Sequence, residues 1–244
     1  MTGSRKTVWG TVVGTVVFAV SGCSSQDRAT SPEEVRKLAG SAQAAHGRQR
    51  TQDRLRDVVQ TYAKDTPLGP GMVVIRDTCF GGAAKQWLES NGDDAYKIRC
   101  SMRVTAYYGV DPKRVGSVLD GVLAAGDRPG SLIAFGHDYY RNHLVDYYRG
   151  HGPNPSGPHA PEPTQLFDSS QTLAWDPLHD RNPRLLVDEP EQCPKNDPPV
   201  TRCLRESGSG SVADIRKRHG MVFKLELGST EYYEVAKDGQ VVMD

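Results

Sequence analysis

The sequence predicts an α+β fold in two layers, in which a mixed, mostly antiparallel sheet packs against helices. Three observations support this class: an alternating strand pattern at residues 95–108, helical patterns before and after it, and a hairpin signal near the C-terminus. The chain has 244 residues, which suits one globular domain with an appended loop-rich region. Lys and Arg together number 30, as do Asp and Glu. Because no excess of positive charge is present, we expect no nucleic-acid partner.

The N-terminus has the pattern of an export signal. Arg5 and Lys6 precede an apolar run of thirteen residues, Val8 to Val20. A transmembrane helix needs about 20 apolar residues, so this run is too short to span a bilayer comfortably. We therefore predict a signal peptide at residues 1–22. The export route, general secretory or twin-arginine, stays open.

The apolar run ends in Val20-Ser21-Gly22-Cys23, an aliphatic residue, two small residues and a cysteine. This motif resembles the lipobox of bacterial lipoproteins, and the chain resembles the uncharacterised membrane lipoproteins of actinobacteria. The resemblance implies cleavage before Cys23 and attachment of a diacylglyceryl group, with fatty acids such as palmitate, to the Cys23 thiol. It also implies a lipid-anchored protein of the cell envelope, on the extracytoplasmic face of the plasma membrane. The alternatives are a plain secreted protein or a short buried helix with a chance cysteine.

Four further cysteines are present: Cys79, Cys100, Cys193 and Cys203. Outside the cytoplasm an even number of cysteines indicates disulfides, and four cysteines allow three pairings. We favour Cys79–Cys100 and Cys193–Cys203, because each bridge closes a short loop and the first pair lies on two adjacent candidate strands. A zinc site would need closely spaced cysteine pairs, which the chain lacks. The sequence therefore predicts no metal ligands and no cofactor.

Residues 23–50 are expected to form a lipid-anchored tether that becomes helical, and residues 51–150 an α+β core. Ser31 and Pro32 are residue types that favour the start of a helix. The apolar pattern of a second helix ends before Pro67. Residues 72–80 are predicted to pair with the long strand, with one face formed by Val73, Ile75, Asp77 and Cys79.

The long strand at residues 95–108 alternates between an apolar face and a polar face. The polar face includes Arg99, Arg103 and Tyr107, and we expect it to be exposed to solvent. A helix from Asp111 to Gly126 and a strand at residues 132–135 follow. A strand, a helix and a strand in this order predict a βαβ unit, so that part of the sheet would be parallel.

Residues 137–151 contain the phrase Asp-Tyr-Tyr-Arg twice. A helix from Asp138 to Gly150 explains the pattern better than a strand, since only a helix sorts the apolar and polar residues onto separate sides. The functional alternative is a platform of histidines and tyrosines for a metal or a sugar. His137 and His143 are six residues apart, whereas helical metal ligands need a spacing of three or four.

Residues 151–210 are predicted to form a Pro-rich excursion pinned by Cys193–Cys203. Residues 211–244 are predicted to return to the core as a helix that Ser211 begins and Gly220 ends, followed by a hairpin at Asp238-Gly239. The excursion is either a preorganised recognition loop or a cover for one edge of the sheet.

The sequence contains no local catalytic motif, and we assign no catalytic residue. It favours a non-catalytic envelope protein that binds an unidentified ligand or partner protein. The candidate binding surfaces are the excursion and the polar face of the long strand. The alternative is an extracytoplasmic hydrolase whose catalytic residues are dispersed in the sequence.

Overall fold

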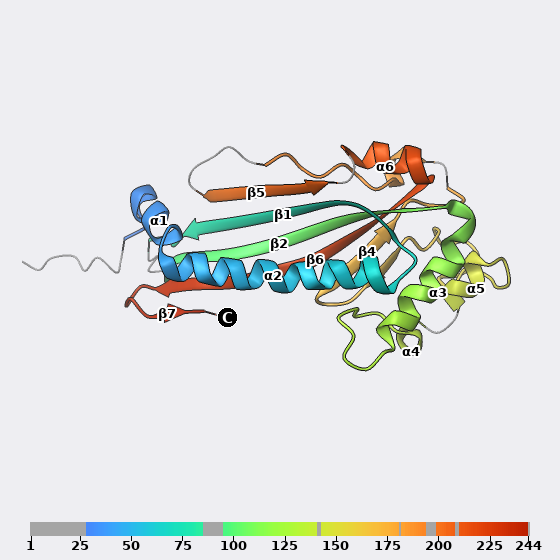
Figure 1. Cartoon of the computed structure of the whole chain (residues 1–244), viewed down its shortest axis with the longest axis horizontal. Helices are drawn as coiled ribbons and strands as arrows, with labels where there is room; N and C mark the ends of the chain where they lie inside the picture. The colour runs from blue at the N-terminus through green and yellow to red at the C-terminus, as the bar shows by residue number, and fades with distance from the viewer. Residues whose placement is uncertain are drawn as a thin grey trace, which may run out of the picture.

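A computed structural model describes residues 28–84, 95–140, 143–180, 182–193, 199–207 and 210–243. Its described part has the predicted α+β class, with helices packed on a seven-stranded sheet (Figure 1). The predicted signal peptide and Cys23 lie outside the described residues, so lipid attachment at Cys23 stays a prediction. Among the described helices, none combines the length and the apolar character that a membrane span requires.

The sheet is built around three long neighbouring strands, β6, β2 and β1. The strand order is β3-β4-β6-β2-β1-β5, with the short β7 paired to β6. Every strand pair in the described part of the chain is antiparallel. The strands are β1 (Gly69–Gly81), β2 (Tyr96–Val110), β3 (Gln165–Phe167), β4 (Gln171–Trp175), β5 (Val200–Ser207), β6 (Met221–Ala236) and β7 (Val241–Val242).

The predicted parallel βαβ unit is wrong, because residues 132–135 form an irregular segment and not a strand. Ile133 and Phe135 are buried in the core, as an apolar run requires. The side chain of Gln171 donates to the carbonyl of Leu132 at 2.7 Å and accepts from the amide of Ala134 at 3.3 Å. One glutamine thus provides hydrogen bonds that a neighbouring strand would otherwise provide.

One face of the sheet is covered by the long helix α2, which runs along the strands (Figure 1). Ser31 and Ser41 cap α1 and α2 through their side chains. Val35, Ala39 and Ala44 are buried, so much of the predicted tether at 23–50 belongs to the domain. The helices are α1 (Pro32–Ala39), α2 (Ala42–Asp65), α3 (Val115–Gly126), α4 (His137–Tyr140), α5 (His143–Tyr148) and α6 (Val212–His219), with 3-10 turns η2 (Pro112–Arg114) and η3 (Pro183–Leu185).

Gly47 allows α2 to approach the sheet closely. A Cβ atom at this position would lie 2.7 Å from the carbonyl oxygen of Tyr232 on β6. Such a contact would push the helix away from the sheet, so the glycine explains how a long helix and β6 pack tightly.

The opposite face of the sheet is covered at one end by α6, which Ser211 and Gly220 delimit as predicted. Tyr107 was expected on an exposed face, but it is only 3% exposed. It packs in a small second core, and this burial raises its pKa to about 12. The other members of this core are Met72, Val187, Val212, Ile215 and Val222.

The segment predicted as a loop-rich excursion contributes the strands β3, β4 and β5. Strand β5 pairs with β1 and strand β4 pairs with β6, so the excursion extends the sheet at both edges of the three central strands. Both predicted disulfides are confirmed. The Cα atoms are 4.0 Å apart in Cys79–Cys100 and 5.9 Å apart in Cys193–Cys203.

The Asp-Tyr-Tyr part of each repeated phrase lies in a short helix, 138–140 in α4 and 146–148 in α5. Residues 141–142 lie between them and outside the described residues. The helical prediction is therefore confirmed on both sides of this position. The predicted hairpin at Asp238-Gly239 is also confirmed, because β6 and β7 pair across it.

Candidate functional site

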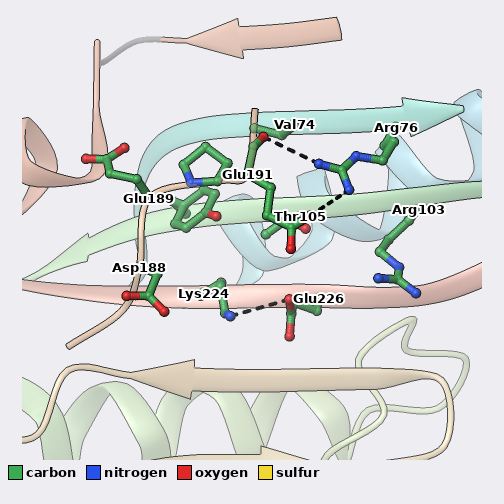
Figure 2. A pocket seen from close by; sticks show the side chains of 11 residues that line it. Val74, Arg76, Arg103, Thr105, Asp188, Glu189, Glu191, Lys224 and Glu226 are labelled. Carbon is green, nitrogen blue, oxygen red and sulfur yellow. Dashed lines mark hydrogen bonds and ion pairs between the residues drawn. The ribbon is translucent and has the colours of Figure 1, made fainter. Parts of the chain in front are cut away.

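The sheet face opposite α2 carries a groove lined mainly by charged side chains (Figure 2). Its volume is about 200 Å³. The groove lies over β1, β2 and β6, and residues 187–191 form one wall. Its lining residues are Val74, Arg76, Arg103, Thr105, Tyr107, Asp188, Glu189, Pro190, Glu191, Lys224 and Glu226.

A second hollow, of about 310 Å³, adjoins the groove over β2, β6 and β4. The two hollows share Arg103 and Glu226. The turn between β3 and β4 supplies hydroxyl groups to the second hollow through Ser169 and Ser170. Together the two hollows offer a polar path across four strands, and Arg103 lies where they meet.

Strand alternation places like charges side by side in this groove. Arg76 on β1 and Arg103 on β2 are directly opposite each other, an arrangement that is unfavourable unless an anion compensates it. Glu191 neutralises Arg76 at 2.8 Å, and Glu226 pairs with Lys224 at 3.4 Å. The exposed Arg103 has no hydrogen bond or ion pair within the part of the chain that the structure describes (Figure 2).

The groove wall at 187–191 is held in place at both ends. Asp176, which is 3% exposed, accepts hydrogen bonds from the amide of Val187 at 2.8 Å and from the guanidinium of Arg216 at 2.8 Å. At the other end, the ion pair of Glu191 and the bridge of Cys193 connect the wall to β1 and β5. The groove is therefore shaped before any ligand arrives.

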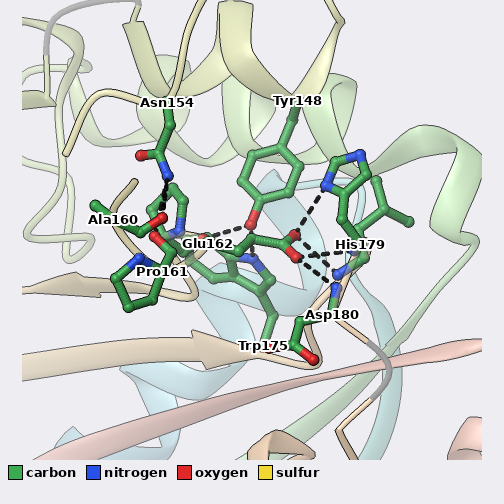
Figure 3. A network of polar contacts seen from close by, with 10 residues as sticks. Tyr148, Asn154, Ala160, Pro161, Glu162, Trp175, His179 and Asp180 are labelled. Atoms are coloured by element: carbon green, nitrogen blue, oxygen red, sulfur yellow. Dashed lines mark hydrogen bonds and ion pairs between the residues drawn. The ribbon is translucent and has the colours of Figure 1, made fainter. Parts of the chain in front are cut away.

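A network around Glu162 holds the Pro-rich part of the excursion (Figure 3). The Glu162 carboxylate accepts from three backbone amides, those of Leu178 and His179 at 2.8 Å and that of Asp180 at 3.2 Å. Burial by itself raises the pKa of Glu162, but these hydrogen bonds outweigh it and lower the pKa. The carboxylate therefore acts as a structural acceptor, and the Pro-rich segment is fixed to the domain.

His137 is the histidine with the closest carboxylate contacts in the described residues. Its Nδ1 lies 2.6 Å from Asp127 and its Nε2 lies 3.0 Å from Asp120, which also pairs with Arg149 at 2.9 Å. The hydrogen bond to Asp127 is the main cause that raises the pKa of His137. Both ring nitrogens are occupied, so neither is left to take a proton from a nucleophile.

This arrangement predicts a pH-dependent contribution of His137 to stability. Because its pKa is raised in the folded state, the contribution is present in full below the unfolded pKa of about 6.5 and is lost as the pH rises through the folded pKa. His137→Gln is expected to cost more stability at about pH 6 than at about pH 9. Urea unfolding of both proteins at the two pH values measures this difference. His46→Gln, at an exposed position on α2, is the control, and an equal cost of His137→Gln at both pH values would contradict the interpretation.

The polar face predicted from β2 is divided by the structure. Arg103 lines the groove, Tyr107 is buried at its floor, and Arg99 lies elsewhere in an ion pair of 2.7 Å with Glu234. The anchoring carboxylate Asp176 could not be predicted from the sequence, because its partners come from three separate segments. The wall at 187–191 was not predicted either, since no local pattern marks it.

No protein family, curated protein or solved structure matches this chain. Among the described residues, no group of three or more His, Cys, Asp or Glu side chains could hold a metal ion. The geometry of the groove therefore carries the argument about function.

Proposed function

We propose that this chain is an extracytoplasmic protein, anchored to the membrane by lipid at Cys23, whose groove binds an anionic ligand without chemical turnover. The observation that carries the binding role is the guanidinium of Arg103, which is exposed in the groove and faces a second arginine. A guanidinium binds a carboxylate or a phosphate through two parallel hydrogen bonds. Because Glu191 pairs with Arg76, Arg103 is the guanidinium left to receive such a ligand.

The surroundings of Arg103 support a binding role. The wall at 187–191 is fixed by Asp176 and a disulfide, so little conformational freedom is lost on binding. The hydroxyl group of Thr105 lines the groove beside Arg103 and can donate to an anion, whereas the hydroxyl of Ser170 already donates to Asp168 at 2.7 Å. His137 is paired with carboxylates, and the carboxylate of Glu162 accepts hydrogen bonds from backbone amides. Because the polar atoms of both side chains are engaged in structural hydrogen bonds, they favour binding over catalysis.

Arg103→Ala is expected to weaken anion binding by about 10- to 100-fold, because a hydrogen bond to a charged group contributes about 1.5–3 kcal/mol. The probes are glycerol phosphate and a tetraglutamate peptide, which separate phosphate from carboxylate recognition, titrated by NMR or calorimetry. Arg202→Ala is the matched control, because Arg202 is an exposed arginine on β5 opposite Asp77, on the other face of the sheet. Equal affinity of Arg103→Ala and the parent protein for both probes would reject the groove as the binding site.

The hydrolase alternative is tested with the same purified protein. Turnover of ester, peptide or glycoside substrates that is lost on substitution of a single histidine or carboxylate would replace the binding role with catalysis. The two histidines to substitute first are His137 and His179, since both contact carboxylates.

The anchor is tested by Cys23→Ser expressed in an actinobacterial host. Without the thiol no diacylglyceryl group can be attached, so the protein is expected to leave the membrane fraction or to keep its signal peptide. Fractionation and intact mass spectrometry measure both outcomes. Cys203→Ser, which removes a cysteine of a bridge, is the control for a general effect of cysteine loss. Unchanged membrane attachment with an unchanged mass would reject lipid attachment at Cys23.

A further inference from the structure

The first described residues enter the domain at a defined place, the end where β1 stops and β2 begins. The amide of Thr30 donates to the carbonyl of Gly82 at 2.9 Å. The ammonium of Lys237 donates to the carbonyls of Arg28 at 2.5 Å and Ala83 at 3.0 Å. Helix α1 and the β6–β7 hairpin lie at the same end, which we call the tether end (Figure 1).

The tether end is the part of the domain that a lipid at Cys23 would hold against the bilayer. Four residues lie between Cys23 and Arg28, and the five steps from one Cα atom to the other extend over at most about 18 Å. The 24 residues of α2 alone measure about 36 Å from one end of the domain toward the other. The anchor therefore restrains the tether end, and the end that carries α3 and α4 lies beyond its reach.

Large apolar side chains are exposed at this same end. Phe80 is 49% exposed and Val242 is 48% exposed, and the neighbouring Val241 and Met243 are also exposed. Phe80 is opposite Arg99, Arg99 is opposite Glu234, and Glu234 is opposite Val242. At about 4.8 Å per strand, this row places Phe80 and Val242 about 14 Å apart on one face of the sheet.

We propose that the tether end rests on the lipid bilayer, with Phe80 and residues 241–243 inserted among the headgroups and the first acyl carbons. This inference depends on the proposed lipid anchor at Cys23. Transfer of exposed apolar side chains out of water is favourable, and the bilayer is the apolar phase that the anchor brings within reach. Arg99, which lies between the apolar residues, pairs with Glu234 at 2.7 Å and with Glu231 at 3.6 Å, so no unpaired guanidinium lies in this row.

This orientation also places the groove relative to the membrane. Arg103 follows Arg99 by four residues along β2, which corresponds to about 13 Å away from the tether end. The groove then opens sideways above the headgroups, where it is accessible to soluble ligands and to the protruding parts of envelope molecules.

The test uses the full-length mature protein, lipidated in its host and reconstituted in vesicles of phosphatidylglycerol and brominated phosphatidylcholine. Bromine quenches tryptophan only at contact with the acyl region, so Phe80→Trp and Val242→Trp report insertion at the two ends of the row. Leu132→Trp is the matched control, since Leu132 is 46% exposed and lies between α3 and α4 at the opposite end (Figure 1). Emission of the parent protein is subtracted, and urea unfolding verifies that each variant folds.

We expect the emission added by Phe80→Trp and Val242→Trp to shift to shorter wavelength and to lose most of its intensity in brominated vesicles, while Leu132→Trp is unaffected. A lipidated protein, verified by mass, in which all three variants behave alike would overturn the membrane-resting orientation and leave the anchor intact. A mature protein without lipid at Cys23 would overturn both the anchor and the inference that depends on it.

Discussion

Asp77→Ala is expected to lower the free energy of unfolding by about 3–5 kcal/mol, because it removes one partner of a buried ion pair. Asp77 on β1 is buried beneath α2. It accepts hydrogen bonds from the guanidinium of Arg48 at 2.6 Å and from the hydroxyl of Tyr232 at 2.5 Å. Without the carboxylate, the nearly buried Arg48 keeps its charge and loses its counter-ion. Urea unfolding followed by circular dichroism measures the loss.

Asp53→Ala is the matched control for this ion pair. Asp53 is an exposed residue on the same helix as Arg48. Its ion pair with Arg56 is long, at 4.0 Å between nitrogen and oxygen. Exposed pairs contribute at most about 1 kcal/mol, so its removal is expected to change stability little. The double variant Arg48→Met with Asp77→Leu is expected to be more stable than Asp77→Ala, since no charge is left buried. Equal costs of Asp77→Ala and Asp53→Ala would contradict the interpretation.

Replacing Cys79 and Cys100 by alanine is expected to destabilise the protein more than the same change at Cys193 and Cys203. Loop closure favours both bridges almost equally, by about 3 kcal/mol each, because the loops of 21 and 10 residues differ little on a logarithmic scale. The difference arises from packing. Cys79 and Cys100 are buried in the core, so the alanines also leave a cavity there.

The two double variants are compared by urea unfolding under non-reducing conditions. The exposed side chain of Cys203 leaves no core cavity, so loss of this second bridge is expected to cost about 3 kcal/mol or less. It is also expected to release the groove wall at 187–191 and to weaken binding of an anion at Arg103. A larger loss of stability from the second pair than from the first would show that the excursion, and not the core strands, limits unfolding.

The α+β class, the strands β1 and β2 and both disulfides could be predicted from local patterns in the sequence. Alternation over β2 marks one packed face, and the same alternation over β1 brings Cys79 opposite Cys100. Helix boundaries at Ser31, Ser211 and Gly220 follow from the capping preferences of these residue types. These features are readable because each depends on residues that are neighbours in the chain or on a period of two.

The short strands β3, β4 and β5 could not be predicted in this way. Their three to eight residues carry little periodic signal. Strands β5 and β4 form because the edges of β1 and β6 offer unpaired backbone groups, and β3 then pairs with β4. Conversely, residues 132–135 have strand-like composition but pair with none of the strands that the structure describes. The side chain of Gln171 pairs with their backbone instead.

The candidate site shows the same division between local pattern and tertiary contact. Alternation placed Asp77 on the same face as Cys79 and Arg103 on a polar face, and both placements are confirmed. The sequence could not reveal that Asp77 meets Arg48 and Tyr232, which are 29 and 155 residues away. Nor could it reveal that Arg76 pairs with Glu191, 115 residues distant, while Arg103 forms no ion pair with the residues that the structure describes. The face on which a side chain lies follows from the local backbone, whereas its charged partners depend on which distant segments the fold brings together.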